Sequence, residues 1–312
     1  MATVYVGLSG GVDSSVAALL LKQQGYEVVG VYMKNWSQDL PGMKCPWEED
    51  YRDAKRIAVQ LGIEFKLYDF EKEYRHKVVD YMIREYKAGR TPNPDVMCNQ
   101  EIKFKLFLET ALDDGADYIA TGHYASLKPL VASLASGGAG TPRSSRRSAS
   151  SESPVLTHRN NTYGSLRAST HPSISSKPKA SGHGLGLYRA RDEDKDQTYF
   201  LYRITPEALS KTLFPLGELT KPQVRALAKK HNLVTASRKE SMGICFVGNV
   251  GIKQFLSQYL AEKTGKIIDQ NNKVVGEHEG AAFYTIGQRH GLNVGGGLPY
   301  YATGKDMKKN EV

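Results

Sequence analysis

The stretch that decides the fold is Thr3-Val4-Tyr5-Val6-Gly7-Leu8-Ser9-Gly10-Gly11-Val12-Asp13-Ser14-Ser15, near the start of the chain. Its first half is a run of β-branched and aromatic residues, which predicts a buried strand. The run breaks at Ser9-Gly10-Gly11 and apolar residues with helical spacing follow, so a helix begins close to Asp13. Bare glycines at a helix start let an oxyanion approach backbone N–H groups, and the helix dipole favours negative charge there. The stretch therefore predicts an anion site between a strand and a helix.

Side chains of the same stretch add to this anion site. The hydroxyls of Ser9 and Ser14 can donate hydrogen bonds, and Asp13 can hold a magnesium ion that neutralises phosphate charge. The loop differs from the Walker loop, because no G-K-[ST] follows, and from the G-x-G-x-x-G dinucleotide turn. The pattern S-G-G-x-D-S resembles the PP-loop of ATP pyrophosphatases, enzymes that split ATP between its α and β phosphates. The alternative is an ordinary strand–turn–helix connection with a glycine-rich bend.

Strand and helix patterns alternate over residues 1–129. Further strands are predicted at 27–33, 65–70 and 117–122, and helices at 48–61, 74–87 and about 101–112, the last after a polar loop at 90–95. The alternation predicts an α/β fold with a doubly wound parallel sheet covered on both faces. Ligands of such sheets bind beyond the carboxyl ends of the strands. We therefore expect four segments to gather at that edge: the glycine loop, Met33-Lys34, the Asp95 loop and Gly122-His123.

Length and composition limit the classes of protein. A chain of 312 residues can form two domains, and it contains no run of about 18 apolar residues that would span a membrane. The chain starts directly in a strand, without the basic and apolar regions of a secretory signal. Its three cysteines argue against a disulfide framework and for a reducing compartment. These features predict a cytoplasmic protein with no membrane partner.

Residues 130–186 differ in kind from the rest of the chain. The segment contains seven basic residues and one acidic residue, so it carries six of the nine net positive charges of the chain. Serine, glycine, arginine, proline and alanine dominate, and such a composition cannot bury enough apolar surface to offset the entropy of ordering. We therefore expect disorder. The segment is either a basic tether for RNA or a tolerated loop insertion, and we favour the insertion because long surface loops cost little free energy.

The last third of the chain predicts a smaller unit. Thr220 is expected to cap a helix that continues to Ala228, and further elements are a short helix near 255–260, a β-containing region from Lys266 and a strand at 300–302. These patterns divide the chain into four parts. They are a nucleotide-binding domain at 1–129, the insertion at 130–186, a return to the first domain at 187–212 and a C-terminal α+β domain at 213–312.

The cysteines differ in their surroundings. Cys98 follows Asn93-Pro94-Asp95 at a predicted helix start, where the dipole stabilises a thiolate; the alternative is a buried, inert cysteine. Cys245 lies between apolar residues, and its surroundings alone favour a structural role. Cys45 has no comparable context and is expected to be a packing or surface residue. No zinc spacing of His and Cys is present, so His123 is expected to be a polar site residue.

Taken together, these motifs resemble those of one family, the tRNA-specific 2-thiouridylases, from residue 4 to about residue 305 outside the insertion. The matching motifs are GLSGGVDS at 7–14, MKNW at 33–36, GRTPNPD at 89–95 with Cys98-Asn99, IKF at 102–104, ATGHYA at 120–125, KDQTYFL at 195–201, GICF at 243–246 and TIGQRHGL at 285–292. The resemblance implies an adenine nucleotide α-hydrolase-like fold. Members of the family have a far shorter connection at the insertion, and they continue into a C-terminal β-barrel, before which this chain is expected to end.

The resemblance also implies a role for each matching residue. ATP is expected on Gly7, Leu8, Ser9, Gly10, Gly11, Val12, Asp13 and Ser14, with Met33 and Gly122 near its nucleoside. Asn93, Pro94 and Asp95 are expected to hold the flipped target base, and Asp95 to act in acid–base catalysis. Contacts with tRNA are expected from His123, Lys195, Asp196 and Gln197.

The implied reaction is the ATP-dependent 2-thiolation of the wobble uridine of tRNA. ATP adenylates the C2 oxygen of the uracil, and pyrophosphate leaves with magnesium. A persulfide on Cys245, loaded by a sulfur-relay protein, delivers sulfur to C2. Cys98 then attacks the persulfide and leaves a disulfide that a reductant reopens, or else Cys98 binds C2 directly.

Two other functions fit part of the sequence. Another ATP pyrophosphatase acting on a small substrate would explain the glycine loop but would leave Cys98 and Cys245 without roles. A nucleotide-binding protein without turnover would leave the cysteines inert. The resemblance instead favours the thiolation of tRNA by a monomeric sulfurtransferase that uses ATP and magnesium.

Overall fold

The computed structural model describes residues 1–39, 45–129, 184–239, 252–295 and 299–312. Contacts divide the chain into one unit of residues 1–128 and 185–312 and a second unit of residues 129–184. The predicted disordered insertion at 130–186 lies outside the described residues except for its last three positions. Two of these begin strand β6 (Leu185–Tyr188), which pairs with β5 (Ser126–Pro129).

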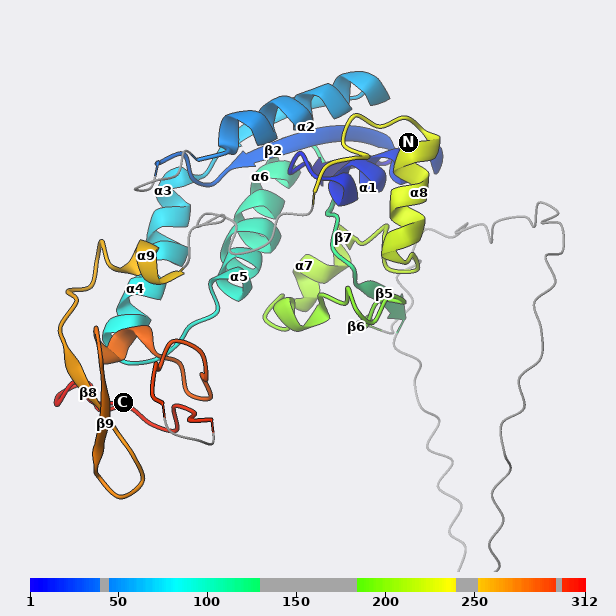
Figure 1. Ribbon diagram of the computed structural model, residues 1–312. Coiled ribbons are helices and arrows are strands. Elements are labelled where there is room, and N and C mark those ends of the chain that lie inside the picture. The colour runs from blue at the N-terminus through cyan, green and yellow to red at the C-terminus, as the bar shows by residue number, and fades with distance from the viewer. Residues whose placement is uncertain (40–44, 130–183, 240–251, 296–298) are drawn as a thin grey trace, which may run out of the picture. The chain divides into compact units, whose positions relative to one another are not determined.

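A five-stranded parallel sheet forms the centre of the first unit (Figure 1). The strands lie in the order β3-β2-β1-β4-β7, and every neighbouring pair is parallel. Their bounds are β1 (Thr3–Gly7), β2 (Glu27–Lys34), β3 (Glu64–Asp69), β4 (Tyr118–Ala120) and β7 (Thr212–Leu213). The predicted parallel α/β sheet is confirmed. The strand order reverses direction at β1, and a crevice for a ligand is expected beyond the carboxyl ends of β1 and β4.

Both faces of the sheet are covered by helices, as the apolar strands predicted. Val4 and Val6 of β1 are buried in one apolar cluster, whereas Tyr5 between them is buried in another, because successive side chains point to opposite faces. The first cluster contains residues of α1 (Val12–Gln23), α2 (Trp47–Leu61) and α8 (Lys221–Lys230). The second contains residues of α4 (Asp80–Lys87) and α6 (Phe107–Asp113). Figure 1 shows α2 and α6 on opposite sides of β2.

Several helix ends follow directly from the sequence. The predicted helix at 48–61 is α2, and Gly62 ends it with a left-handed φ of 59°. The predicted helix at 74–87 runs from Glu71 through α3 (Glu71–Tyr74), the π-helical segment η1 (Arg75–Val79) and α4. Before α8, the N–H of Thr220 donates to Gln223 Oε1 at 2.8 Å in a capping box. The helix extends to Lys230, two residues beyond the prediction.

Three predicted elements differ in the structure. The helix predicted at 101–112 begins at Pro94, because α5 (Pro94–Met97), the π-helical segment η2 (Cys98–Leu106) and α6 are continuous. The helix predicted at 255–260 is α9 (Ile252–Leu256). No strand forms at residues 300–302, where backbone hydrogen bonds join Ala302 to Gly287 and Gln288.

The remaining elements lie in the second half of the chain. They are η3 (Thr198–Phe200), α7 (Pro206–Ser210), β8 (Gly265–Ile268), β9 (Val274–His278) and η4 (Ala281–Phe283). The antiparallel pair β8–β9 confirms the predicted β-containing region after residue 265. In the described parts of the chain, no helix has both the length and the apolar character that crossing a bilayer requires.

Candidate active site

The glycine loop joins β1 to α1 at the point where the strand order reverses. Gly10 adopts a φ of +73°, a conformation that suits glycine. The hydroxyl of Ser14 accepts a hydrogen bond from the N–H of Ser9 at 3.2 Å, and the hydroxyl of Ser15 donates to the carbonyl of Gly11 at 2.7 Å. No side chain caps the start of α1. The serines therefore fix the loop while the helix N-terminus remains suited to an anion.

Two other strand ends contact this loop. A Cβ atom at Gly122, just after β4, would lie 2.7 Å from the backbone nitrogen of Ser14. A Cβ atom at Gly7 would lie 2.9 Å from Cε of Met33 at the end of β2. The expectation that these segments gather at one edge of the sheet is confirmed for Met33 and Gly122. At Gly122 only glycine permits such a close approach of the two backbones, whereas at Gly7 the near atom belongs to the Met33 side chain.

Asp13, in the first turn of α1, has partners that the sequence did not indicate. The Nζ atom of Lys221 lies 2.8 Å from both of its carboxylate oxygens, and the hydroxyl of Tyr124 donates to it at 2.9 Å. Lys221 is the first residue of α8 and is 9% exposed. The sequence around Lys221 does not indicate a functional site, because Lys221 is followed by a proline at an ordinary helix start. Its contact with Asp13 becomes visible only in the folded chain.

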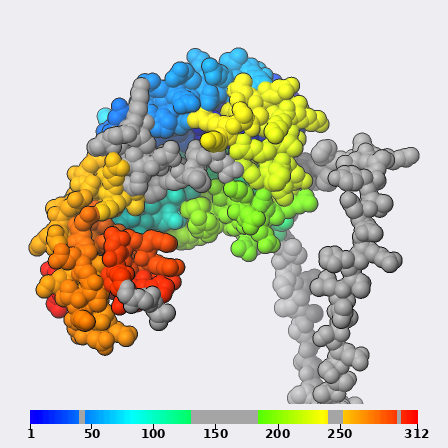
Figure 2. Space-filling model, in the orientation of Figure 1, coloured from blue at the N-terminus to red at the C-terminus, as the bar shows by residue number. Residues whose placement is uncertain are grey.

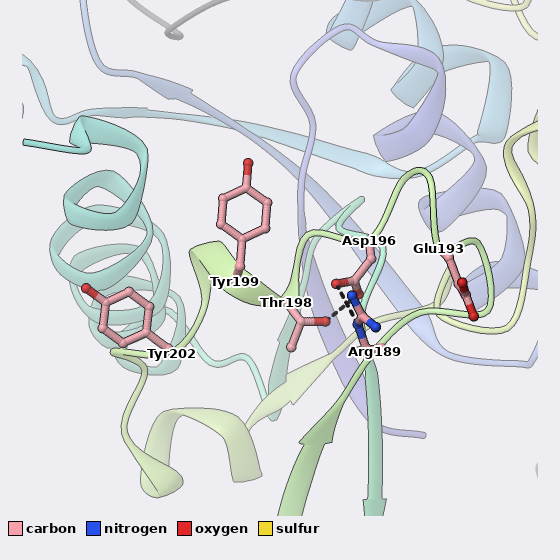
Figure 3. Close-up of a pocket in the computed structure, with 6 residues that line it drawn as sticks. All are labelled: Arg189, Glu193, Asp196, Thr198, Tyr199 and Tyr202. Atoms are coloured by element: carbon pink, nitrogen blue, oxygen red, sulfur yellow. Dashed lines mark hydrogen bonds and ion pairs between the residues drawn. The ribbon is translucent and has the colours of Figure 1, made fainter. Parts of the chain in front are cut away.

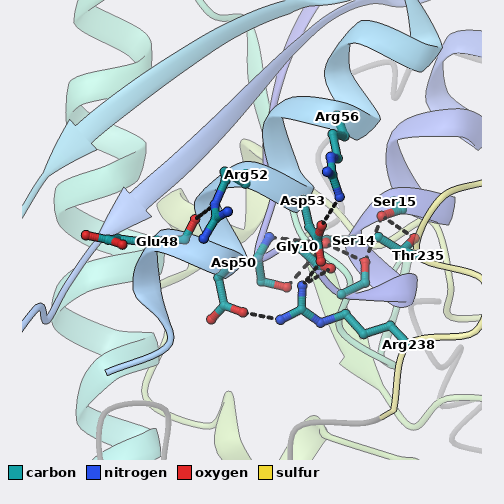
Figure 4. A network of polar contacts seen from close by, with 12 residues as sticks. Gly10, Ser14, Ser15, Glu48, Asp50, Arg52, Asp53, Arg56, Thr235 and Arg238 are labelled. Atoms are coloured by element: carbon teal, nitrogen blue, oxygen red, sulfur yellow. Dashed lines mark hydrogen bonds and ion pairs between the residues drawn. The ribbon is translucent and has the colours of Figure 1, made fainter. Parts of the chain in front are cut away.

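A second cation, Arg238, contacts the glycine loop (Figure 4). Arg238 donates a hydrogen bond to the carbonyl of Gly10 at 3.1 Å and forms ion pairs with Asp50 and Asp53 of α2. Burial raises the pKa of Asp50, and Arg238 partly opposes this effect. The segment after α8 therefore lies against α2, and Figure 2 shows their yellow and blue surfaces in contact.

Asn93, Pro94 and Asp95 form a helix start rather than the predicted loop. The side-chain oxygen of Asn93 accepts hydrogen bonds from the N–H groups of Asp95 at 3.0 Å and Val96 at 3.3 Å. Pro94 occupies the first helical position, where the missing N–H has no cost. Burial raises the pKa of the Asp95 carboxyl, and the positive charge of Lys103 partly opposes this effect. A raised pKa suits a group that exchanges protons near neutral pH.

Cys98 lies further inside the helix than expected. It follows α5 and begins the π-helical segment η2, so the predicted position at the helix N-terminus is wrong by one turn. The side chain is 2% exposed and is packed within the apolar cluster that contains Tyr5. Cys245, its predicted reaction partner, lies outside the described residues. Cys45, the third cysteine, is half-buried, and its thiol lies 3.6 Å from the carbonyl oxygen of Trp36.

The positive charge of Lys103 affects the pKa values of both Asp95 and His123. Burial has the larger effect on the pKa of each group. In His123, burial and the charge of Lys103 together keep the pKa well below its ordinary value. The His123 ring is 8% exposed, with Nδ1 2.8 Å from the hydroxyl of Thr121, and it packs against Phe104 and Phe214. His123 is thus a neutral interior residue of this site.

Comparisons with known proteins agree with this geometry. Residues 2–144 and 158–249 match the family described as tRNA methyl transferase HUP domain, and residues 253–312 match the tRNA methyl transferase PRC-barrel domain. The chain is 46% identical over 308 residues to the tRNA-specific 2-thiouridylase MnmA of Bacillus subtilis, covering 98% of this chain and 69% of the relative. It is 45% identical over 313 residues to that of Lactobacillus helveticus, covering 99% and 70%. The chain belongs to the tRNA-specific 2-thiouridylase family.

The 2-thiouridylase motif at residues 195–197 forms part of the fold. The side chain of Asp196 accepts hydrogen bonds from the N–H of Ala190 and the hydroxyl of Thr198. Gln197 exchanges two hydrogen bonds with the backbone of Tyr124, at 2.9 and 3.1 Å. The segment is thereby fixed beside β4, and its contacts with tRNA remain a prediction.

The described side chains around Asp13 do not form a magnesium site made of protein ligands alone. Both carboxylate oxygens of Asp13 contact Lys221, so the predicted metal ligand is already paired with a cation. Within the described ranges, no group of three or more His, Cys, Asp or Glu side chains is arranged to hold a metal ion. Lys221 supplies positive charge beside Asp13, where the sequence predicts a magnesium ion.

Proposed function

We propose that this protein catalyses the ATP-dependent 2-thiolation of the wobble uridine of tRNA. The observation that carries the proposal is the identity of about 46% with 2-thiouridylases over nearly the whole chain. The glycine loop with its two cations and the helix that carries Asp95 and Cys98 supply groups that this reaction requires. The proposal includes the expected monomer, and a sulfur-relay protein as the source of sulfur.

The first step activates the uracil. ATP binds on residues Gly7 to Ser14, with its phosphates at the N-terminus of α1 and its nucleoside near Met33 and Gly122. The C2 oxygen attacks the α-phosphorus, the bond to the β-phosphate bridge breaks, and pyrophosphate leaves. Lys221, held by Asp13, neutralises charge on the departing phosphates. Magnesium enters this proposal only as the counterion of the ATP substrate.

The second step replaces oxygen by sulfur. The outer sulfur of the Cys245 persulfide attacks C2, and the C2–O bond breaks to release AMP. The thiolate of Cys98 then attacks the inner sulfur, so that the S–S bond breaks with its electrons moving to the thiocarbonyl. The product is 2-thiouridine, and the two cysteines form a disulfide that a reductant reopens. Direct attack of Cys98 on C2 remains the alternative route.

Asp95 controls the proton of the uracil. Its raised pKa matches a base that removes the N3 proton as the C2 oxygen attacks ATP and returns that proton when the thiocarbonyl forms. The nearby charge of Lys103 stabilises the negative charge that develops on the ring. Asn93 and Pro94 fix the helix start that carries Asp95 and so hold the flipped base. Lys195, Asp196 and Gln197 complete the tRNA site in this proposal, whereas His123, expected as a tRNA contact, is buried and supports the site from the interior.

Methylation of tRNA is a second candidate, because the matching family carries that description. The two reactions differ in what they consume: thiolation requires ATP and a persulfide, whereas methylation requires a methyl donor and neither of these. The ATP pyrophosphatase-like loop and Cys98 at the helix of Asp95 favour thiolation. Mass spectrometry of tRNA nucleosides distinguishes them directly, since sulfur and methyl substitution change the mass of uridine differently.

The experiment is a thiolation assay with tRNA, ATP and a persulfide donor, read as 2-thiouridine and AMP. We expect Cys245→Ser to abolish 2-thiouridine while adenylation of tRNA remains measurable. Cys98→Ser is expected to lower 2-thiouridine strongly, and Cys45→Ser serves as the matched control with full activity. Normal thiolation by Cys245→Ser would refute the persulfide role, and a wild-type protein that forms no 2-thiouridine would refute the proposed function.

A further inference from the structure

A pocket of about 540 Å³ has an aromatic end and a charged end (Figure 3). Its lining residues are Arg189, Glu193, Asp196, Thr198, Tyr199 and Tyr202. The two tyrosine rings lie at one end, and the charged side chains lie at the other. Such a volume is within the range of pockets that hold small ligands. Asp95 and Cys98 are not among the lining residues, so the pocket is separate from these proposed reacting groups.

The tyrosines of this pocket are unusually accessible. Tyr199 is 60% exposed and Tyr202 is 71% exposed, although large aromatic residues are usually buried in part. One face of the Tyr199 ring rests on Phe200, with ring centroids 3.8 Å apart. Phe200 in turn packs against the main apolar cluster. The ring is therefore held in place before any ligand arrives, which lowers the entropic cost of stacking another ring on it.

Two observations join this surface to the helix of the reacting groups. The Asp95 carboxylate is close enough to contribute to the raised pKa of the Tyr199 hydroxyl, after the larger effect of desolvation. The guanidinium of Arg203 lies 3.6 Å from the sulfur of Met97, the residue before Cys98. Tyr199 and Arg203 therefore both lie near α5. A nucleotide next to a uridine held at Asp95 would meet these side chains.

The charges of the pocket select a base rather than a phosphate. Glu193 and Asp196 line it, and Arg189 lies 3.8 Å from a carboxylate oxygen of Asp196. A phosphate inside would therefore be repelled, whereas a base has a π-face that stacks on tyrosine whatever its sequence. Arg203, exposed beside Tyr202, has the charge that a backbone phosphate at the rim would need.

We propose that Tyr199, assisted by Tyr202, is the stacking surface for the unpaired anticodon-loop base next to the target uridine, with Arg203 on the adjoining phosphate. The inference rests on the proposed function, because it places the target uridine at Asp95. Proteins that recognise single-stranded RNA commonly stack unpaired bases on aromatic side chains. Stacking of the neighbour would fix the anticodon loop while the target base is turned toward Cys98.

The test is a binding cycle with a labelled anticodon stem–loop RNA and two RNAs that lack the base on either side of the target uridine. We expect Tyr199→Leu to weaken binding of the intact RNA on the order of 10-fold, the scale of one base–aromatic stack. The same substitution should have almost no effect on one of the two abasic RNAs, because the stack is already lost there. Tyr199→Phe should bind like the wild type, and Tyr188→Leu, which removes an exposed tyrosine outside the pocket, is the matched control.

A salt titration separates stacking from charge. Arg203→Gln should reduce the dependence of binding on salt by about one phosphate contact, whereas Tyr199→Leu should leave this slope unchanged. The inference would be overturned if Tyr199→Leu weakened the binding of the intact RNA and of both abasic RNAs by the same factor. Unchanged binding of the intact RNA by Tyr199→Leu would also overturn it. Thiolation by the wild type is measured in parallel. The stacking inference alone fails if the wild type thiolates tRNA but Tyr199→Leu has the same effect on intact and abasic RNAs. The proposed function fails if the wild type forms no 2-thiouridine.

Discussion

The ammonium group of Lys221 lies 2.8 Å from both carboxylate oxygens of Asp13, although 208 residues separate them in the chain. The pair joins the N-terminus of α8 to the N-terminus of α1, and the side chains of Lys221 and Asp13 are 11% and 32% exposed. A buried lysine is tolerated when it is paired, and this pair positions its charge beside the glycine loop. In the proposed function, helix α8 is therefore part of the nucleotide site, although its sequence is that of an ordinary capped surface helix.

Replacement of Lys221 tests this assignment. We expect Lys221→Met to raise the KM for ATP by about 10-fold or more, since a hydrogen bond to a charged group contributes roughly 1.5–3 kcal/mol. Lys221→Arg should retain part of the affinity. Lys230→Met, at the exposed end of the same helix, is the matched control and should behave like the wild type. An unchanged KM in Lys221→Met would remove this lysine from the ATP site.

Arg238 and Arg56 both contact Asp53, which makes a matched pair for a stability test. Arg238 is 21% exposed and also contacts Asp50 and the carbonyl of Gly10, whereas the side chain of Arg56 is 68% exposed and reaches only 3.4 Å from Asp53. We expect Arg238→Met to lower the free energy of unfolding by about 1–3 kcal/mol, because it removes the ion pairs with two partly buried carboxylates and the hydrogen bond to Gly10. Arg56→Met should cost less than about 0.5 kcal/mol.

Urea unfolding measures both Arg variants against the wild type. Similar losses for the two substitutions would contradict the role of Arg238 in joining the segment after α8 to the glycine loop. ATP binding gives a second readout. Because Gly10 lies in the loop itself, Arg238→Met should also weaken ATP binding, and Arg56→Met should not.

The central sheet could be predicted because its determinants are local. The β1 run, the left-handed Gly62 and the Thr220 cap each depend on residues close together in the chain, and each is found where expected. The start of α5 was missed for a local reason as well. Asn93-Pro94 reads as a rigid loop, but asparagine at the cap and proline at the first position are also the preferred start of a helix.

The cations of the site could not be predicted in the same way. Lys221 and Arg238 contact partners about 190 to 230 residues away, and nothing in their own neighbourhoods marks them. Only the three-dimensional fold brings them to the glycine loop. Tyr199 and Tyr202 are a similar case, because alternation alone does not tell whether an aromatic residue is buried or exposed.

Asp95 should make stability depend on pH. Its folded-state pKa is raised above the ordinary 3.8, so ionisation costs more in the folded than in the unfolded protein. Below the ordinary pKa the carboxyl is protonated in both states and costs nothing. As pH rises from there through the raised pKa, the penalty appears, and it is then constant. We expect Asp95→Asn to raise the melting temperature relative to the wild type at pH 7, with a smaller difference at pH 4.

Activity should change in the opposite direction. Asp95→Asn removes the proposed base, so thiolation should fall by about 100-fold or more, the usual contribution of a general acid–base group. A variant that is both more stable and inactive would identify a residue kept for function at a cost in stability. A melting-temperature difference that is equal at pH 4 and pH 7 would show that burial does not act on this carboxyl.

Gly122 provides the sharpest steric test of the site. A methyl group at this position would meet the backbone of Ser14 at 2.7 Å and of Asp13 at 2.9 Å, distances that force β4 and α1 apart. We expect Gly122→Ala to cost roughly 1–3 kcal/mol of unfolding free energy, as for an overpacked core, and to abolish most ATP binding. Gly304→Ala, where a Cβ atom would meet nothing within 4 Å, is the matched control and should change neither quantity. Calorimetric titration with ATP decides the matter, because normal ATP affinity in Gly122→Ala would show that the close contact between β4 and α1 is not needed to hold the nucleotide.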